Sequence, residues 1–198
     1  RTIEVQFFGE EDGLSHREVN AVYQDEQELI WLGTLRGLDR FDGHRFRHWS
    51  FQELELKGLR IFDLNGDLSG RIWLSVGESP SFLQRVFVFD PRSEQLDPLG
   101  VAVPAIDSLK RNIEPTSIVK SSDGALWLGT QEAGLIRYRS QDSVQFFGRD
   151  EKTYCRPLAT LPDHSVWVHW GKSQLVRIAP TGQILATVEL GNPQPNQT

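Results

Sequence analysis

Four short segments along the chain share one pattern of hydrophobic and polar positions. In each, a tryptophan has an aliphatic residue on both sides and follows a group of turn-forming residues, as in Ser122-Asp123-Gly124 ahead of Leu126-Trp127-Leu128. Short apolar runs rich in β-branched and aromatic residues, bounded by Gly, Asp and Ser, are typical of β-strands. We therefore expect each of the four tryptophans, Trp31, Trp73, Trp127 and Trp167, to lie in a strand that follows a tight turn.

The spacing of these tryptophans indicates a repeat. They are separated by 42, 54 and 40 residues, and a period of roughly 40–50 residues is typical of a four-stranded propeller blade. An apolar run before each tryptophan predicts a first strand, and the tryptophan segment predicts the second. Runs that begin at Gly37 and Gly134 predict third strands, and 45–49 and 143–147 predict fourth strands. The longer middle interval predicts an insertion.

The repeat leads to a fold class. We predict an all-β protein, a β-propeller of about four four-stranded antiparallel blades, in which the tryptophans are buried between sheets. The predicted propeller spans residues 1–191, with blades at about 17–50, 58–99, 115–148 and 155–190. Val5-Gln6-Phe7-Phe8-Gly9 recurs at 144–148 within a predicted fourth strand, so 3–8 is predicted as a closing strand. These features favour a fragment of a larger ring, and 192–198 is predicted as a disordered tail or linker.

Composition excludes several classes of function. The chain is 38% hydrophobic with a formal net charge of -6, so it has the composition of a globular domain and repels a nucleic-acid backbone. Its apolar runs are shorter than a membrane helix needs. Cys155 is the single cysteine, which excludes an internal disulfide. Because the first residue is Arg1, we interpret the chain as a processed product or an excised fragment.

The sequence offers little to metal or catalytic chemistry. No two of the five histidines, at positions 16, 44, 48, 164 and 169, have HxH spacing, and we expect no metal site and no cofactor. A G-x-S-x-G nucleophile motif is missing from the sequence. The acidic segment 63–67 is interpreted as a hairpin junction rather than a calcium loop. We therefore expect this segment not to be an enzyme.

Two of the four repeats support a family resemblance. Residues 13–50, GLSHREVNAVYQDEQELIWLGTLRGLDRFDGHRFRHWS, resemble the regulator-propeller repeat of the periplasmic sensor regions of bacterial hybrid two-component histidine kinases. Residues 117–147 are similar through DGALWLGT and AGLIRY, whereas repeats two and four depart from the pattern at Ser75-Val76 and His169-Trp170. The resemblance implies a seven-bladed ring, a periplasmic location, ligand sensing and relay to an output kinase. It also implies that the remaining blades, or a second copy of the chain, complete the assembly, and that any membrane contact is made by other parts of the full-length protein.

Propeller ligands usually lie where the loops that lead into first strands meet the loops between second and third strands. In these loops we predict ligand-binding residues at His16, Arg17, Arg36, Glu78, Gln131, Glu132, Arg156, His169, Trp170 and Lys172. Trp170 has two interpretations, a stacking platform for a sugar ring or a residue packed against a neighbouring blade.

Three functions remain open at this point. The first is a sensor module that binds a solute, with an oligosaccharide breakdown product as one candidate. The second is a propeller enzyme, a lyase or hydrolase, although the sequence shows no convergent carboxylates or histidines. The third is a scaffold for protein partners.

Overall fold

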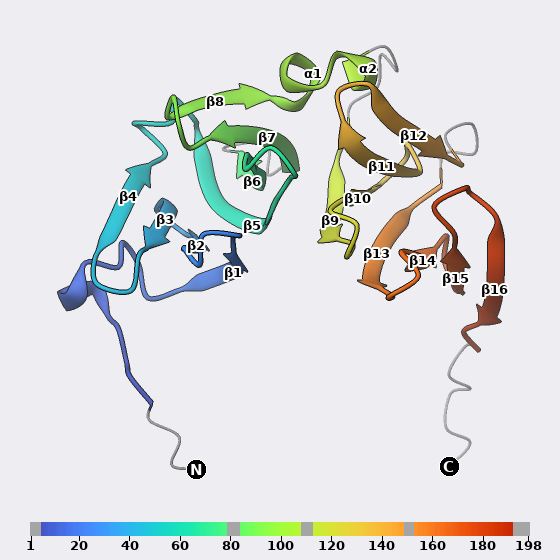
Figure 1. Cartoon of the computed structure of the whole chain (residues 1–198), viewed down its shortest axis with the longest axis horizontal. Coiled ribbons are helices and arrows are strands. Elements are labelled where there is room, and N and C mark those ends of the chain that lie inside the picture. The colour runs from blue at the N-terminus through green and yellow to red at the C-terminus, as the bar shows by residue number, and fades with distance from the viewer. Residues whose placement is uncertain (1–4, 79–83, 108–112, 149–152, 192–198) are drawn as a thin grey trace, which may run out of the picture. The chain divides into compact units, whose positions relative to one another are not determined.

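The protein forms four antiparallel four-stranded sheets. The computed structural model describes residues 5–78, 84–107, 113–148 and 153–191, and its 16 strands in these ranges form four sheets, each built from four consecutive strands (Figure 1). We call the sheets blades 1 to 4 in chain order. The all-β propeller prediction is confirmed, and the described strands of every blade fall within the predicted ranges.

The first two blades follow a short 3-10 helix, η1 (Glu10–Asp12). Blade 1 contains β1 (Val19–Gln24), β2 (Ile30–Thr34), β3 (Gly37–Phe41) and β4 (Phe46–Ser50). Blade 2 contains β5 (Gly58–Gly66), β6 (Ile72–Glu78), β7 (Gln84–Asp90) and β8 (Gln95–Pro98). All four tryptophans of the repeat lie in second strands, as the sequence predicts.

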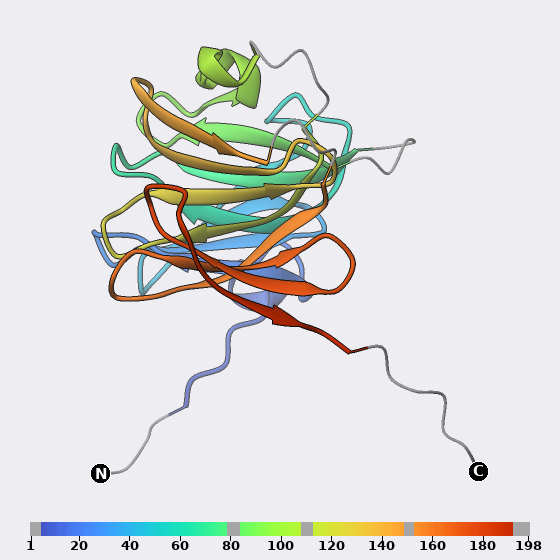
Figure 2. The ribbon, with the colours of Figure 1, turned by 90° about the vertical axis from the view of Figure 1, so that its right-hand side faces the viewer.

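Blades 3 and 4 follow two short helices that occupy the long interval between repeats, α1 (Leu99–Ala102) and α2 (Pro104–Asp107). Blade 3 contains β9 (Pro115–Lys120), β10 (Leu126–Thr130), β11 (Leu135–Ser140) and β12 (Ser143–Phe147). Blade 4 contains β13 (Cys155–Thr160), β14 (Val166–Trp170), β15 (Gln174–Ile178) and β16 (Ile184–Glu189). In Figure 2 the strands of blade 4 are coloured from orange to red, and the twist of the sheet is visible.

The chain divides into two compact units. Unit 1 comprises residues 1–66 and 70–97, and unit 2 comprises 67–69 and 98–198. Unit 1 thus contains blades 1 and 2, and unit 2 contains blades 3 and 4.

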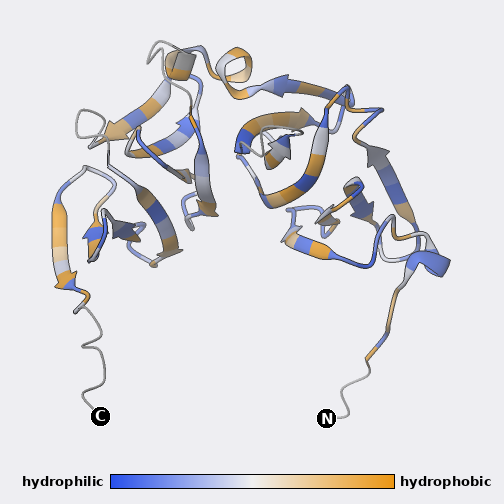
Figure 3. Cartoon of the chain, turned by 180° about the vertical axis from the view of Figure 1, so that it is seen from behind, coloured by the Kyte–Doolittle hydropathy of each residue, from blue (hydrophilic) through white to orange (hydrophobic). Residues whose placement is uncertain are grey.

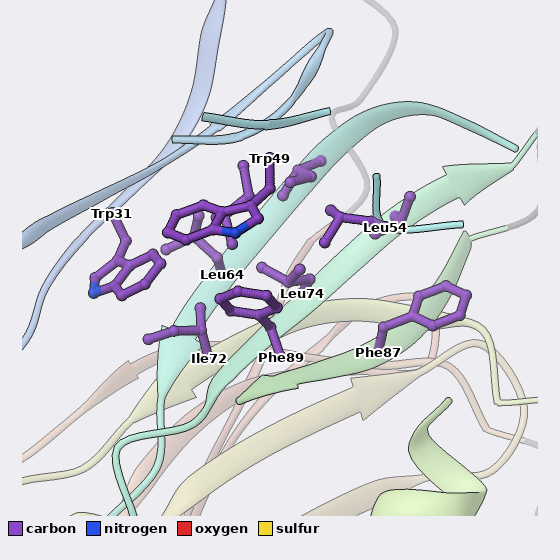
Figure 4. Close-up of a cluster of buried hydrophobic side chains, with 11 residues drawn as sticks. Trp31, Trp49, Leu54, Leu64, Ile72, Leu74, Phe87 and Phe89 are labelled. Carbon is purple, nitrogen blue, oxygen red and sulfur yellow. The ribbon is translucent and has the colours of Figure 1, made fainter. Parts of the chain in front are cut away.

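In unit 1, the core lies between the two sheets. Trp31 is 1% exposed and stacks on Trp49 with 5.7 Å between the ring centroids, while Phe89 of blade 2 meets both indoles edge-on (Figure 4). The guanidinium of Arg40 lies over both indole rings, an arrangement that adds electrostatic attraction to the apolar contact. Two stacked indoles of blade 1 and one phenylalanine of blade 2 therefore fill the space between the two sheets.

In unit 2, Trp127 has the same role. It is fully buried and packs in a cluster with Cys155 and the blade 4 residues Val166 and Val168. Phe147 stacks on it from the fourth strand at 5.7 Å. Arg137 lies over the indole ring, with the guanidinium carbon 5.5 Å from the ring centroid. It also forms an ion pair with Asp123 of the turn before β10. The turn, the second strand and the third strand are thereby held together.

Each second strand follows a turn with one left-handed residue, three positions before the tryptophan. Gly70 and Gly124 occupy this position in blades 2 and 3, whereas Glu28 and His164 adopt it in blades 1 and 4, both at φ 64°. Only glycine adopts this conformation without a steric cost from Cβ. In blade 1, Asp25 compensates by accepting hydrogen bonds from the amides of residues 27 and 29 and, at 2.8 Å, from the indole N–H of Trp31.

Two predictions need correction. Residues 5–8, the described part of the predicted closing strand 3–8, form no strand. A closing strand needs the edge of a neighbouring sheet, and here Phe8 instead packs on Phe41 and Phe46 of blade 1, at 4.7 and 6.0 Å between centroids.

The second correction concerns Trp167, which the repeat predicts to be buried. It is only partly buried, because no further sheet covers its side of blade 4 among the described residues. The predicted tail at 192–198 lies outside the described residues.

Candidate functional site

A threonine organises the loop between second and third strands in two of the blades. In blade 1, Thr34 Oγ1 donates to the carbonyl of Gly37 at 3.1 Å and accepts from the amide of Arg36 at 3.0 Å. In blade 3, Thr130 Oγ1 donates to the carbonyl of Gly134 at 2.7 Å and accepts from the amide of Ala133 at 2.8 Å. Both threonines are fully buried. The Gly-Thr pairs seen in the sequence therefore fix the loops from which candidate ligand residues project.

In unit 1, four of the predicted ligand residues are placed. Arg36 is exposed and its guanidinium donates to the carbonyl of Ser15 at 3.3 Å, which holds the loop before β1 beside the loop before β3. His16 Nδ1 accepts from the amide of Glu18 at 3.0 Å, and Arg17 is exposed. Glu78 forms an ion pair with Arg85 at 3.1 Å, in the neighbouring strand of its own hairpin. The structure thus brings Arg36 to the segment that contains His16 and Arg17, and pairs Glu78 elsewhere.

Sequence reasoning missed a buried acidic residue in this unit. Asp39 is fully buried in β3, its Oδ1 lies 2.6 Å from His48 Nδ1, and its Oδ2 accepts from the amide of Ser15 at 2.9 Å. Ser15 in turn hydrogen-bonds Thr34 at 3.0 Å. A buried carboxylate needs such partners, and here they position the loop before β1. In the sequence, Asp39 lies between Leu38 and Arg40. Strand alternation by itself does not indicate that this acidic residue is buried.

In unit 2, the remaining candidates divide into two groups. Gln131 and Glu132 are exposed in the blade 3 loop, and the amide of Gln131 donates to the carbonyl of Glu114 at 2.9 Å. Arg156, His169, Trp170 and Lys172 gather at one end of blade 4. Arg156 lies directly opposite His169 in the ladder between β13 and β14, and Trp170 lies opposite Cys155.

Trp170 occupies the position of the buried threonine in blades 1 and 3. Its indole packs over Gly148, where a Cβ would lie 2.5 Å from the ring, and against the cluster that contains Trp127. The side chain is partly buried. Its contacts match the packing interpretation of the two that the sequence left open.

Tyr154, which is not among the predicted ligand residues, also belongs to this group. Its ring meets the imidazole of His169 edge-on at 5.6 Å between centroids. Because residues at i and i+2 of a strand share a face and ladder partners face the same way, Tyr154, Arg156 and His169 share one face of blade 4. Arg156 is exposed and forms no ion pair with a described residue, and His169 Nε2 is buried without a hydrogen-bond partner in the described part of the chain.

No group of three or more His, Cys, Asp or Glu side chains within the described ranges could hold a metal ion. No helix in those ranges is long and apolar enough to cross a membrane.

Comparison with known families identifies one repeat. Residues 13–36, from the loop before β1 to the end of the loop before β3, match the family model described as two component regulator propeller. No curated protein matches the chain.

Solved structures share the fold at low identity. A catalytically inactive virginiamycin B lyase from Staphylococcus aureus, solved with quinupristin, aligns over 91% of this chain and 59% of its own, with a TM-score of 0.60 and 14% identity. The extracellular domain of a protein assigned as a hybrid two-component system from B. thetaiotaomicron aligns over 91% of this chain and 30% of its own, with a TM-score of 0.50 and 17% identity. Apo AztD from Citrobacter koseri aligns over 87% and 47%, with a TM-score of 0.55 and 12% identity. At these identities the likeness shows the propeller fold, and the chain spans only part of each of these proteins.

Proposed function

We propose that this chain, whose residues 13–36 carry a two-component regulator propeller repeat, is part of the extracytoplasmic sensor region of a bacterial two-component signalling protein. The observation that carries the proposal is the match of those residues to the regulator model. The propeller fold, which an extracellular domain of a hybrid two-component system also has, is consistent with it. In a bacterium with two membranes, the location is the periplasm.

The sensor binds a solute through polar residues of these loops and of the neighbouring strand ends. Arg36 in unit 1 and Arg156 in unit 2 are exposed cations on fixed backbone supports, and neither forms an ion pair with a described residue. Polar side chains on rigid scaffolds are the usual means by which a site orients a ligand. An oligosaccharide fits this chemistry, because it offers many hydroxyl groups to arginine and amide donors and apolar ring faces to aromatic side chains.

Relay to an output kinase requires a difference in affinity. A bound solute shifts an equilibrium only if it binds one conformation of the sensor more tightly than another. The proposal therefore needs saturable binding first, and a change in the rest of the signalling protein second.

The test is a thermal-shift screen with oligosaccharides, followed by calorimetric titration of any that respond. A ligand present at 100 times its Kd stabilises the folded state by about 2.7 kcal/mol, which is about 5–11 °C for a chain of this size. Arg36→Gln and Arg156→Gln are the test variants. Arg139→Gln is the matched control, because Arg139 is an exposed arginine of β11 near the opposite end of blade 3 from the Thr130 loop.

Each outcome has a distinct meaning. Saturable binding without turnover, weakened by a test variant and unchanged by the control, supports the sensor. Product formation that disappears in His169→Ala indicates a propeller enzyme instead. If no solute changes the melting temperature while a neighbouring protein domain does, the chain is a scaffold and the sensor proposal is wrong.

A further inference from the structure

Two blades have a pair of very small residues at the same place in the ladder between first and second strands. Gly33 lies opposite Ala21 in blade 1, and Gly129 lies opposite Ser117 in blade 3. Both glycines follow the repeat tryptophan by two positions. We call this position the inner ladder pair.

The small size has a direct cause in each unit. A Cβ on Gly33 would lie 2.5 Å from Ile61 Cγ2 of the next blade, and a Cβ on Gly129 would lie 2.3 Å from the carbonyl oxygen of Cys155. Ser117 also donates its hydroxyl to the carbonyl of Pro157 at 3.0 Å. In each unit, therefore, the first strand of the following blade lies directly against the inner ladder pair.

Blade 4 has Arg156 and His169 as its inner ladder pair. These are among the bulkier side chains, and they occupy the side of the sheet on which a following strand would approach. A further blade cannot approach blade 4 as β13 approaches β9, because the arginine and imidazole fill that space. The same side of blade 4 contains the partly buried Trp167 and the 47% exposed Val188, and much of β16 is apolar (Figure 3).

The groups on this side are hydrogen-bond donors. Arginine offers five N–H donors in a fork that fits a carboxylate, and tyrosine and the N–H of a neutral or charged imidazole also donate. His169 Nε2 is buried with no partner in the described part of the chain, and such an atom costs free energy until a bound group satisfies it. Trp167 lies on the same strand face, two residues or about 7 Å from His169, and offers a flat apolar surface.

We infer that Tyr154, Arg156 and His169 of blade 4 form a binding site for a carboxylate group, with the Trp167 indole beside it for an attached apolar or sugar ring. The site takes the place that small residues leave for a following strand in blades 1 and 3. The inference deepens the proposed sensor function and rests on it for its biological role, since it names acidic sugars as the class of solute.

The test uses a pair of ligands that differ only in the carboxylate. Galacturonate and galactose are titrated separately into the chain, and the imidazole resonances of His169, assigned with His169→Gln, are followed by NMR. Acetate in a third titration shows whether the carboxylate alone is sufficient. Galacturonate is expected to shift the His169 resonances saturably, acetate to shift them weakly, and galactose to leave them unchanged.

Variants distinguish this site from general charge attraction. Arg156→Gln is expected to raise the Kd for galacturonate at least about tenfold, the cost of losing hydrogen bonds to a charged group. Arg139→Gln makes the same change of charge on blade 3 and is expected to leave the Kd unchanged. A galacturonate shift that persists in Arg156→Gln, or that weakens equally in both variants, would overturn the inference.

The two proposals can fail separately. If neutral oligosaccharides bind and galacturonate leaves His169 unchanged, the carboxylate site is wrong while the sensor function stands. If galacturonate binds at Arg156 and is consumed, the site is right and the sensor function is wrong.

Discussion

Replacing Trp127 with alanine removes a side chain that is completely buried between blades 3 and 4. A tryptophan buries about 150–250 Å², which at about 25 cal/mol per Å² corresponds to about 4–6 kcal/mol. Partial relaxation of the surrounding Cys155, Val166 and Val168 lowers the expected loss to about 3–5 kcal/mol. The change also removes the surface on which Arg137 lies.

Trp167 supplies the internal control. It has the equivalent position in the second strand of blade 4, and its ladder partner Arg177 corresponds to Arg137. Because its indole is only partly buried, Trp167→Ala is expected to cost about 1–2 kcal/mol. The two substitutions therefore remove the same atoms from the same place in the repeat and differ in what covers them.

The free energies are measured by urea unfolding followed by far-ultraviolet circular dichroism, because tryptophan fluorescence changes with the substitution itself. Calorimetry supplies a second measure, in which about 2–4 °C corresponds to each kcal/mol for a chain of this size. Equal losses for the two variants would refute the assignment of Trp127 to an interface between blades and Trp167 to an open side.

Three further predictions concern the turns and the inner ladder pair. Glu28→Gly is expected to stabilise the chain by up to about 1 kcal/mol in urea unfolding, since Glu28 holds a φ of 64° that glycine adopts without cost. Gly129→Ala is expected to destabilise it by about 1–3 kcal/mol because the new Cβ would meet the Cys155 carbonyl, whereas Gly191→Ala, with no atom within 4 Å, serves as a control and changes little. Burial raises the pKa of Asp123, but the Ser121 hydroxyl, the Ala125 amide and Arg137 together lower it below its ordinary value of 3.8. The contribution of Asp123 to stability is therefore complete above that value and is lost as the pH falls below it. The difference in unfolding free energy between the wild type and Asp123→Asn is expected to shrink on acidification. A difference that grew on acidification would contradict the lowered pKa.

Much of the fold could be predicted because one physical requirement recurs. A two-sided sheet needs a large flat residue between neighbours, and the four tryptophans, with their turns and glycines, mark every second strand. The strand boundaries follow from the same pattern, including the fourth strand of blade 3 at 143–147.

The errors arise where local sequence lacks its partner. Val5 to Phe8 has the same residues as 144–147, but β12 pairs with β11 of its own blade, whereas residues 5–8 have no third strand beside them along the chain. A strand depends on pairing with a neighbour as well as on its residues. The partial exposure of Trp167 has the same origin, since the repeat pattern predicts the residue and not the sheet that covers it.

The candidate site was less accessible to sequence reasoning. The predicted loops included exposed polar residues such as Arg36 and Arg156, although Arg156 lies in β13. They did not include the buried Asp39, which accepts a hydrogen bond from the amide of Ser15. Tyr154 could not be selected either, because its importance comes from its contact with His169 across two strands. Such contacts depend on ladder register, which bulges alter.

The stacked indoles of Trp31 and Trp49 give unit 1 an optical signature of its own. Two indoles whose centroids are 5.7 Å apart at an angle of 19° couple their electronic transitions, and coupled transitions of this kind contribute paired bands of opposite sign to a circular dichroism spectrum. In unit 2, Trp127 stacks on a phenylalanine instead. Loss of those bands on heating therefore reports the melting of blades 1 and 2 alone, without any added label.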